Sequence, residues 1–312
     1  MSHFTTIIWN PNSGSAPACA ELLRELRGKP NVDLVESESR THAQLLAREA
    51  TRNSDLIIAA GGDGSVNAIV DALSSQETES VTFGVLPLGS GNDLARNLNM
   101  PLEPRLAIER LLHADPAQDT IMLDLVEAAF DGESFTYANM ATGGNSSDVL
   151  NLLEDEVKQR WGPLCYLRGA VNVMSDLQVY TTNVSIDDED FTDLPLLNIL
   201  VANGCRTGGG LNVAPHAKLD DGLLDVLLIL DGTPIDIAAL SAQLLISDYT
   251  QNDLVIWRQA RNIRVDSNPG MRWTTDGEPV HPTNESPGSA SSNFEVSAKK
   301  LRVVVWEASA SS

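Results

Sequence analysis

Long apolar runs are absent from this sequence. Nowhere in its 312 residues do about 18 apolar residues follow one another, which is the length at which a membrane-spanning helix begins to be indicated. The opening residues, MSHFTTIIWNPNSG, also lack the basic segment and apolar core of a secretory leader. We therefore expect a protein that neither crosses a membrane nor is exported by that route.

Cysteine and histidine are sparse as well. Cys19, Cys165 and Cys205 are odd in number, far apart and without a CxxC pair, which argues against a disulfide framework or a zinc site and favours a reducing cytoplasm. The five histidines are equally dispersed, so the sequence has no HExxH helix and no local pair of histidine ligands.

Basic residues are few. The chain has 21 Lys and Arg against 43 Asp and Glu, a formal net charge of -22, and only five of the basic residues are Lys. This balance disfavours contact with nucleic-acid phosphates, so no nucleic-acid partner is expected. An acidic surface poor in Lys suits high ionic strength, where screening weakens self-repulsion. A salt-adapted source is therefore one hypothesis.

The length favours two domains, and the pattern changes near residue 120. Up to residue 119, short β-rich runs alternate with helical patterns, which indicates a parallel α/β domain. The expected strands are Phe4–Trp9, Val32–Glu36, Asp55–Ala60 and Phe83–Pro87. The expected helices are Ala18–Arg27, one that follows a capping box at Thr41 and Gln44, one after Gly64, and one that ends near Leu98.

Residues 120–312 contain longer β-like runs, which predict a mainly antiparallel, β-sandwich-like second domain. Its expected strands are Thr120–Ala129, Phe135–Met140, Asn183–Asp187, Leu196–Ala202 and Leu223–Leu230, and its expected helices are Trp161–Leu177 and Ile235–Leu245. Pro279–Asn293 is predicted to be an exposed loop before a terminal strand, Leu301–Trp306. That strand is a candidate to return to the first domain.

A glycine-rich turn follows the third expected strand. In Gly61-Gly62-Asp63-Gly64-Ser65, backbone amides at the start of a helix can point at an anion, and the missing side chains allow a phosphate to approach. Asp63 would repel phosphate, so its functional role would be to hold Mg²⁺ or to orient a donor. The alternative is a tight turn with a solvated aspartate.

Two more polar loops follow expected strands. Leu88-Gly89-Ser90-Gly91-Asn92-Asp93 comes after the next strand, and Asn10-Pro11-Asn12-Ser13-Gly14 comes after the first. Since the carboxyl ends of parallel strands share one edge of a sheet, the three loops should line one cleft. The GxxxxGK[ST] phosphate loop, the GxGxxG fingerprint and the protein-kinase motifs are all missing.

With these motifs the sequence resembles the bacterial diacylglycerol kinase and related lipid kinase family, which shares its catalytic domain with sphingosine and ceramide kinases. The resemblance spans nearly the whole chain. It depends on the three loops, on Asn203-Gly with Gly208-Gly-Gly, on Asp221-Gly-Leu-Leu-Asp225 and on Asp276-Gly277-Glu278. It implies ATP as the phosphate donor, Mg²⁺, and a lipid hydroxyl, such as that of diacylglycerol, as acceptor.

The resemblance also assigns residues to the nucleotide. They are Asn10, Pro11, Asn12, Ser13, Gly14, Gly61, Gly62, Asp63, Gly64, Ser65, Val66, Asn67, Ser90, Asn92 and Asp93. Ser37 lies where such kinases often carry a nucleotide-contacting Thr, although the glycine-aspartate pattern around it is replaced by Thr41-His42. A serine hydroxyl can make the same kind of hydrogen bond.

Asp276-Gly277-Glu278 resembles the family's catalytic segment, where a carboxylate accepts the proton of the lipid hydroxyl. Either Glu278 or Asp276 would be this base, and the alternative is a plain surface turn. Asp221, with backbone oxygens of Lys218 and Leu223, resembles the family's structural divalent-ion site. A solvated Asp-Gly turn is the alternative there.

The resemblance implies a cytoplasmic enzyme that meets its lipid at the inner face of the membrane by peripheral contact only. Arg258, Arg261 and Arg264 are a candidate basic patch for that contact. A dimer is compatible with the sequence. Two rival functions stay open: an NAD kinase, which also uses a Gly-Gly-Asp-Gly turn, and a catalytically silent nucleotide- or lipid-binding regulator.

Overall fold

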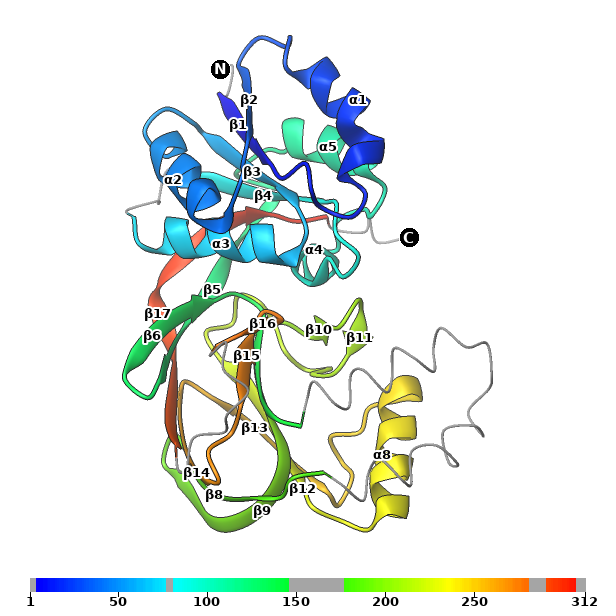
Figure 1. Ribbon diagram of the computed structural model, residues 1–312, viewed down its shortest axis with the longest axis vertical. Coiled ribbons are helices and arrows are strands. Elements are labelled where there is room, and N and C mark those ends of the chain that lie inside the picture. The colour runs from blue at the N-terminus through cyan, green and yellow to red at the C-terminus, as the bar shows by residue number, and fades with distance from the viewer. Residues whose placement is uncertain (1–3, 77–80, 146–176, 281–289, 307–312) are drawn as a thin grey trace.

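The computed structural model describes residues 4–76, 81–145, 177–280 and 290–306. Its upper part in Figure 1 is a parallel sheet covered by helices, and its lower part is a strongly curved antiparallel sheet. The predicted fold class, a parallel α/β part followed by a mainly antiparallel β-rich part, is confirmed.

The parallel part is built from four strands in the order β2-β1-β3-β4. These strands are β1 (Thr5–Trp9), β2 (Val32–Glu36), β3 (Leu56–Gly61) and β4 (Thr82–Pro87). Every residue of β1, β3 and β4 is buried, which explains their continuous apolar sequences, because strands covered on both faces need no polar side.

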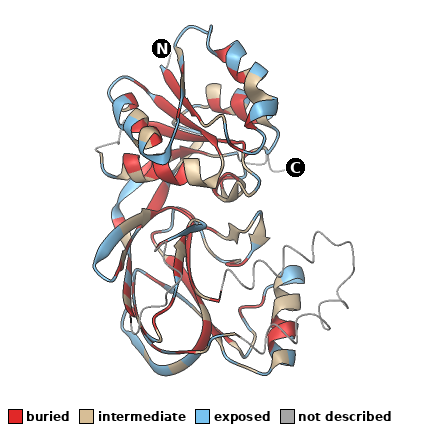
Figure 2. Ribbon diagram, in the orientation of Figure 1, coloured by how far each residue is buried: buried red, intermediate tan, exposed pale blue. Residues whose placement is uncertain are grey.

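Five helices of the described chain accompany these strands: α1 (Ala16–Leu26), α2 (Arg40–Ala50), α3 (Asp63–Ser74), α4 (Asp93–Asn97) and α5 (Pro104–Leu112). Figure 1 shows α2 and α3 on one side of the strands and α1 and α5 on the other. Figure 2 shows that the buried residues follow the strands and the helix sides that face them. The loops after β1, β3 and β4 therefore emerge at the edge that faces the antiparallel part.

The antiparallel part is a continuation of the same sheet. Its strands are β5 (Thr120–Phe130), β6 (Glu133–Tyr137), β7 (Met140–Gly144), β8 (Tyr180–Ile186), β9 (Glu189–Ala202), β12 (Leu224–Leu230), β13 (Val255–Ala260), β14 (Asn262–Asn268), β15 (Trp273–Thr275), β16 (Glu278–Pro279) and β17 (Ala290–Val304). Two short strands, β10 (Arg206–Thr207) and β11 (Leu211–Asn212), form a separate ladder, and helix α8 (Pro234–Ile246) lies outside the sheet.

Strand β17 joins the two parts. It pairs with β14 and β5 in antiparallel fashion, and its last residues pair in parallel with β4, at Arg302 with Thr82 and Val303 with Phe83. In the lower core the aromatic rings of Phe130, Trp273 and Phe294 contact one another with centroids 4.8–5.5 Å apart. Such contacts add to the apolar burial that holds the curved sheet closed.

Two local predictions are wrong. Helix α2 begins two residues earlier than the capping box implied, because Ser39 rather than Thr41 caps it by accepting the His42 amide at 3.1 Å. The terminal strand begins at Ala290 rather than Leu301. The small polar residues of its first half look like a loop, yet Ser292 and Phe294 face inward and alternate with exposed Asn293 and Glu295.

The remaining predicted elements are mostly confirmed, with ends that differ by a few residues. The elements that were not among the predicted ones are α5, β7, β10, β11, β13, β14, β15 and β16. The predicted helix Trp161–Leu177 and most of the loop after Pro279 lie outside the described residues. Within the described ranges no helix is long and apolar enough to cross a membrane.

An ion pair between a buried carboxylate and a partly exposed lysine joins β5 and β17. Asp124 is fully buried, and its Oδ1 lies 2.6 Å from the Nζ of Lys300, its partner in the strand register. The other oxygen of Asp124 accepts the Gly222 amide at 2.6 Å. Lys300 thus balances a carboxylate that also anchors the loop before β12.

Replacing Lys300 by Met should lower the free energy of unfolding by about 2 kcal/mol or more, because it leaves a buried carboxylate without its counter-charge. Urea denaturation followed by circular dichroism measures this change. Lys299→Met is the matched control, since the exposed Lys299 donates to the Ser74 carbonyl rather than to a buried carboxylate and its loss should cost less than about 1 kcal/mol. Equal losses in the two variants would contradict this account of the ion pair.

Candidate active site

Three loops pack together at the carboxyl edge of β1, β3 and β4, as the parallel strand order predicted. The amide of Gly62 donates to the Ser13 hydroxyl at 3.2 Å, and the amide of Leu88 donates to the Gly61 carbonyl at 2.9 Å. A Cβ added at Gly89 would lie 2.6 Å from the Cα of Gly62. Glycine is therefore required at this crossing by close backbone approach.

A cavity of about 390 Å³ opens over these loops. It is lined by Asn10, Asn12, Ser13, Ser37, Glu38, Ser39, Arg40, Ala43, Gly62, Gly64, Ser65, Ala68 and Glu278. Glu278 comes from β16 in the antiparallel part, whereas the other residues come from the parallel part. The cavity thus brings the proposed base to the glycine loops across more than two hundred positions of sequence.

Other predicted nucleotide residues lie beside this cavity rather than in its lining: Pro11, Gly14, Gly61, Asp63, Val66, Asn67, Ser90, Asn92 and Asp93. Val66 and Asn67 are buried in α3, and Ser90 is exposed. Ser37 lines the edge of the cavity while its hydroxyl donates to the carbonyl of Trp9 at 3.2 Å. A hydroxyl that donates one hydrogen bond can still accept another, so Ser37 remains able to contact a ligand.

Asp63 connects two of the loops. Its carboxylate accepts the backbone amides of Asn92 at 2.8 Å and Asp93 at 2.7 Å, at the start of α4. Asn92 has a left-handed backbone with φ of 54°, and its side-chain amide bonds both the amide and the carbonyl of Gly89. Asp63 therefore fixes the second glycine loop in addition to any role toward a ligand.

Asp93 continues this connection into the antiparallel part. Its two oxygens accept the amides of Gly208 and Gly209, each at 2.8 Å, and the Thr207 hydroxyl at 3.3 Å. Burial raises the pKa of Asp93, the negative charge of Asp63 raises it further, and these hydrogen bonds oppose the rise. Two neighbouring carboxylates thus repel each other next to the cavity.

Asp276 and Glu278 have different surroundings. The carboxylate of Asp276 accepts four N–H groups at 2.9–3.1 Å, from Asn67 Nδ2 and from the backbone of residues 138–140. Burial raises the pKa of Asp276, and these four donors oppose the rise. The side chain of Glu278 is exposed, and its Oε1 would lie 2.9 Å from a Cβ added at Gly64. Of the two, Glu278 has the free oxygens.

Several polar residues of the site were missed by the sequence reasoning. Arg40, the first residue of α2, lines the cavity, and its guanidinium donates to Asn67 Oδ1. Asn97 donates to Asn139 Oδ1 at 2.7 Å and accepts the amide of Arg206 at 2.9 Å. Only an isolated polar residue at the end of an apolar run would have pointed to such positions.

The predicted structural-metal residues lie on the loop before β12. Asp221 is exposed, and its Oδ1 accepts the amide of Leu223 at 3.0 Å. The carbonyl of Leu219 accepts the Asp124 amide at 2.7 Å, so this loop is held in place from β5. Among the described residues no three His, Cys, Asp or Glu side chains are grouped to hold a metal, so an ion here would need backbone oxygens, including those of Lys218 and Leu223.

The three arginines do not form a free basic patch. Arg258 Nε lies 2.6 Å from Glu189, and Arg264 Nε lies 3.0 Å from Asp266. Each pair is close to neutral, so the prediction of a basic patch is wrong for these two residues. Glu189 lies 69 positions before Arg258 in the sequence, so no local pattern could show that the two residues pair.

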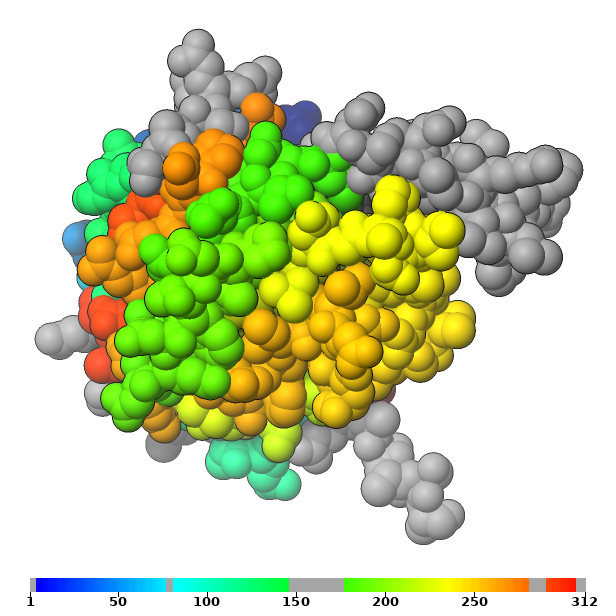
Figure 3. Space-filling model, turned by 90° about the horizontal axis from the view of Figure 1, so that it is seen from below, coloured from blue at the N-terminus to red at the C-terminus, as the bar shows by residue number. Residues whose placement is uncertain are grey.

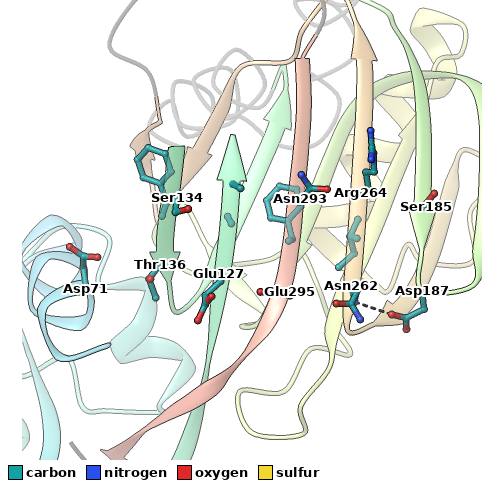
Figure 4. Close-up of a pocket in the computed structure, with 15 residues that line it drawn as sticks. Asp71, Glu127, Ser134, Thr136, Ser185, Asp187, Asn262, Arg264, Asn293 and Glu295 are labelled. Atoms are coloured by element: carbon teal, nitrogen blue, oxygen red, sulfur yellow. Dashed lines mark hydrogen bonds between the residues drawn. The ribbon is translucent and has the colours of Figure 1, made fainter. Parts of the chain in front are cut away.

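A second cavity, of about 550 Å³, lies on the outer face of the antiparallel sheet (Figure 4). Glu127 on β5, Glu295 on β17 and Asp71 on α3 line it together with Asp187. Glu127 and Glu295 lie on the neighbouring strands β5 and β17, and Asp187 follows the end of β8. The Asp187 carboxylate accepts the Asn262 amide at 2.9 Å. An anionic nucleotide is poorly matched to such a wall.

A third cavity, of about 110 Å³, is apolar and lies between α8 and the sheet. Its lining is mostly Leu, Ile, Val and Tyr side chains, with Thr142 and Thr207 among them. The Thr142 hydroxyl is 2.7 Å from that of Thr274, two residues before Asp276, and Thr207 bonds Asp93. One wall of the apolar cavity is therefore hydrogen-bonded to residues next to the polar site.

Comparison with known proteins identifies the family to which the glycine loops and the two-part sheet belong. The chain belongs to the diacylglycerol kinase and YegS-like lipid kinase family: residues 5–123 match the diacylglycerol kinase catalytic domain, and residues 118–305 match the YegS C-terminal NAD kinase beta sandwich-like domain. The resemblance stated from the motifs is confirmed.

Its relatives agree with this assignment. The chain is 31% identical to the "Probable lipid kinase YegS-like" protein of Chromohalobacter salexigens over 77% of this chain and 75% of that one. It is 27% identical to the diacylglycerol kinase of Bacillus subtilis over 87% and 88%. The crystal structure of a diacylglycerol kinase from Bacillus anthracis superposes with a TM-score of 0.72 at 18% identity and 98% coverage of both chains, which shows the shared fold.

Asp276→Asn should lower the free energy of unfolding by about 2 kcal/mol, because an amide nitrogen would replace one oxygen and face N–H donors. Glu278→Gln is the matched control and should change stability by less than about 0.5 kcal/mol, since Glu278 is exposed. Urea denaturation of both variants checks this. A stable Asp276→Asn protein would show that the four hydrogen bonds are not a structural requirement.

Proposed function

We propose that this protein transfers the γ-phosphate of ATP to the hydroxyl of a lipid alcohol of the diacylglycerol type. The observation that carries the proposal is the position of Glu278, which reaches from β16 to the cavity over the glycine loops. Donor loops and a free carboxylate are thereby present in one cavity. Phosphoryl transfer needs little more from a protein than positioning and charge stabilisation.

In this proposal the polyphosphate lies over the loops after β1 and β3. The first amides of α3 begin at Gly62 and Asp63, where a helix N-terminus favours negative charge. Asn10, Asn12, Ser13, Ser37, Gly62, Gly64 and Ser65 would contact the nucleotide. Arg40 lines the same cavity and supplies a positive charge for phosphate oxygens.

The carboxylates near the loops fit a Mg²⁺ that arrives with ATP. Mg²⁺ usually takes one or two protein carboxylates and completes its shell with water and phosphate oxygens, which agrees with the absence of a three-ligand cluster among the described residues. Asp63 and Asp93 would face it, directly or through water, and the repulsion between them favours a cation. When bound, Mg²⁺ neutralises phosphate charge.

Glu278 would act as the base and Asp276 would position it. The lipid hydroxyl gives its proton to the Glu278 carboxylate, its oxygen forms a bond to the γ-phosphorus, and the bond to the β-phosphate oxygen breaks to release ADP. Asp276 keeps its oxygens on Asn67 and on residues 138–140, so it orients the turn that carries Glu278.

The apolar cavity beside α8 supports a lipid acceptor. Its lining would take part of an acyl chain, and Thr142 and Thr207 mark the side nearest the polar site. We assign residues 1–119 to the nucleotide and residues 120–312 to the lipid, with β17 pairing to β4. This substrate implies peripheral contact with the inner face of a membrane, from the cytoplasm. Sedimentation would show whether the protein forms a dimer.

A structural divalent ion on the Lys218–Leu223 loop is a separate part of the proposal. The exposed Asp221 carboxylate and the backbone oxygens of Lys218 and Leu223 are the oxygen ligands that Mg²⁺ or Ca²⁺ takes. Such an ion would hold the loop that Asp124 contacts at Gly222. It would act on folding of this loop, remote from the transfer step.

Purified protein should transfer labelled phosphate from Mg-ATP to diacylglycerol in mixed micelles. Glu278→Gln should lower kcat by about 10²- to 10⁴-fold, because proton removal contributes this much, while the dissociation constant for ATP changes little. Thin-layer separation of labelled lipid measures the first and calorimetry the second. Glu278→Gln with full activity would remove this residue from the mechanism.

Two other results would redirect the proposal as a whole. Phosphorylation of NAD with no labelled lipid from a complete lipid extract would favour the NAD kinase alternative. Tight ATP binding without turnover on any lipid would favour a silent regulator.

Arg40→Ala should raise the KM for ATP by about tenfold, because a charge-assisted contact to phosphate contributes about 1.5 kcal/mol or more. Arg48→Ala is the matched control, since Arg48 is an exposed arginine in the last turn of the same helix. Initial rates against ATP concentration measure both. An unchanged KM in Arg40→Ala would place the phosphates away from α2.

A further inference from the structure

Helix α8 is apolar almost all the way around. Its sequence, PIDIAALSAQLLI, contains one charged residue, Asp236. A helix of this kind is normally enclosed by protein or lipid, yet Ile235 is 66% exposed, Ile246 81% and Leu245 39%. The helix lies beside the curved sheet at the end of the molecule away from the parallel strands (Figure 1), and Figure 3 shows it (yellow) at the surface of that end.

The exposed residues form a stripe. At about 100° per residue, Ile235, Ala239, Ala242 and Ile246 project within about 60° of one another, and this stripe carries no charge. On the opposite side Ile237, Leu240 and Leu244 line the apolar cavity. One helix therefore separates an apolar cavity from an apolar outer surface.

The charges around α8 indicate what the stripe contacts. Residues 231–254 contain no Lys or Arg and four aspartates, Asp231, Asp236, Asp248 and Asp253. An anionic surface would be repelled by them, so binding has to come from the apolar residues. A stripe about 20 Å long with two isoleucines is also small beside the roughly 800 Å² per partner of a stable protein interface.

We propose that the outer stripe of α8 inserts into the surface of an uncharged, zwitterionic bilayer, so that a lipid can pass beneath the helix into the apolar cavity. This inference rests on the proposed lipid kinase function, because a lipid substrate is the reason for contact with a bilayer. The exposure of Ile235 and Ile246 indicates which surface makes that contact. Helices that lie in the membrane interface bury their apolar face in the boundary between headgroups and acyl chains. Thr142 and Thr207 lie in the wall of this cavity and are hydrogen-bonded to Thr274 and Asp93, respectively, on the side of the polar site.

The test uses the full chain with Ile235→Gln and Ile246→Gln together. The matched control is Leu45→Gln with Leu106→Gln, two leucines that are each 51% exposed on α2 and α5. Flotation with phosphatidylcholine vesicles that contain diacylglycerol should fall at least tenfold for the α8 pair and stay unchanged for the control. Added phosphatidylglycerol should weaken binding of the parent protein at low salt.

Activity gives the second readout. With vesicle substrate, the kcat/KM of the α8 pair should fall at least tenfold, whereas with a short-chain diacylglycerol dissolved as monomers it should equal that of the parent protein. Equal flotation of the parent and the α8 pair would overturn the inference, as would stronger binding on added phosphatidylglycerol. A parent protein that dimerises through the stripe without floating would also overturn it. Failure of the parent to phosphorylate even the monomeric lipid would instead reject the kinase proposal, while flotation still tests α8.

Discussion

The Asp276 carboxylate is the contact on which the site depends. Its four N–H donors come from Asn67 in the parallel part and from residues 138–140 in the antiparallel part. A carboxylate is the only common side chain that accepts this many donors while offering none. Because Glu278 is two residues further on, the same hydrogen bonds that join the parts also aim Glu278 at Gly64. The hydrogen bonds that join the two parts are therefore the same ones that complete the cavity.

A second set of carboxylates repeats this arrangement on the other side of the loops. Asp63 accepts amides of the next loop, and Asp93 accepts amides of Gly208 and Gly209. The acidic residues that look catalytic in the sequence thus divide into those that hold backbone and those that face the cavity. Glu278 belongs to the second group, and the oppositely charged Arg40 lines the same cavity. This division explains how a site rich in carboxylates would accommodate the anionic nucleotide that we propose.

Much of the fold could be predicted because the relevant signals are local. The buried runs of β1, β3 and β4 and the glycines after them specify parallel strands with loops at one edge. The partners of single side chains could not be predicted. Asp124 and Lys300 meet through strand register, and Arg258 and Glu189 come from strands far apart in the sequence. The same limit concealed the structural roles of Asp63 and Asp276. It also made half of β17 look like a loop, since its inward positions include Ser292 as well as Phe294.

Strand β17 has a mechanical consequence. It runs beside β5 from the lower core to β4, so two hydrogen-bonded strands cross from one part of the molecule to the other (Figure 1). Their register shifts between Val296 and Lys300, and such bulges bend and twist a ribbon locally. The two parts are therefore joined by a two-stranded ribbon with one bulge. Bending at that bulge would move the parallel part relative to the antiparallel part and would change the width of the cavity that the glycine loops and Glu278 line.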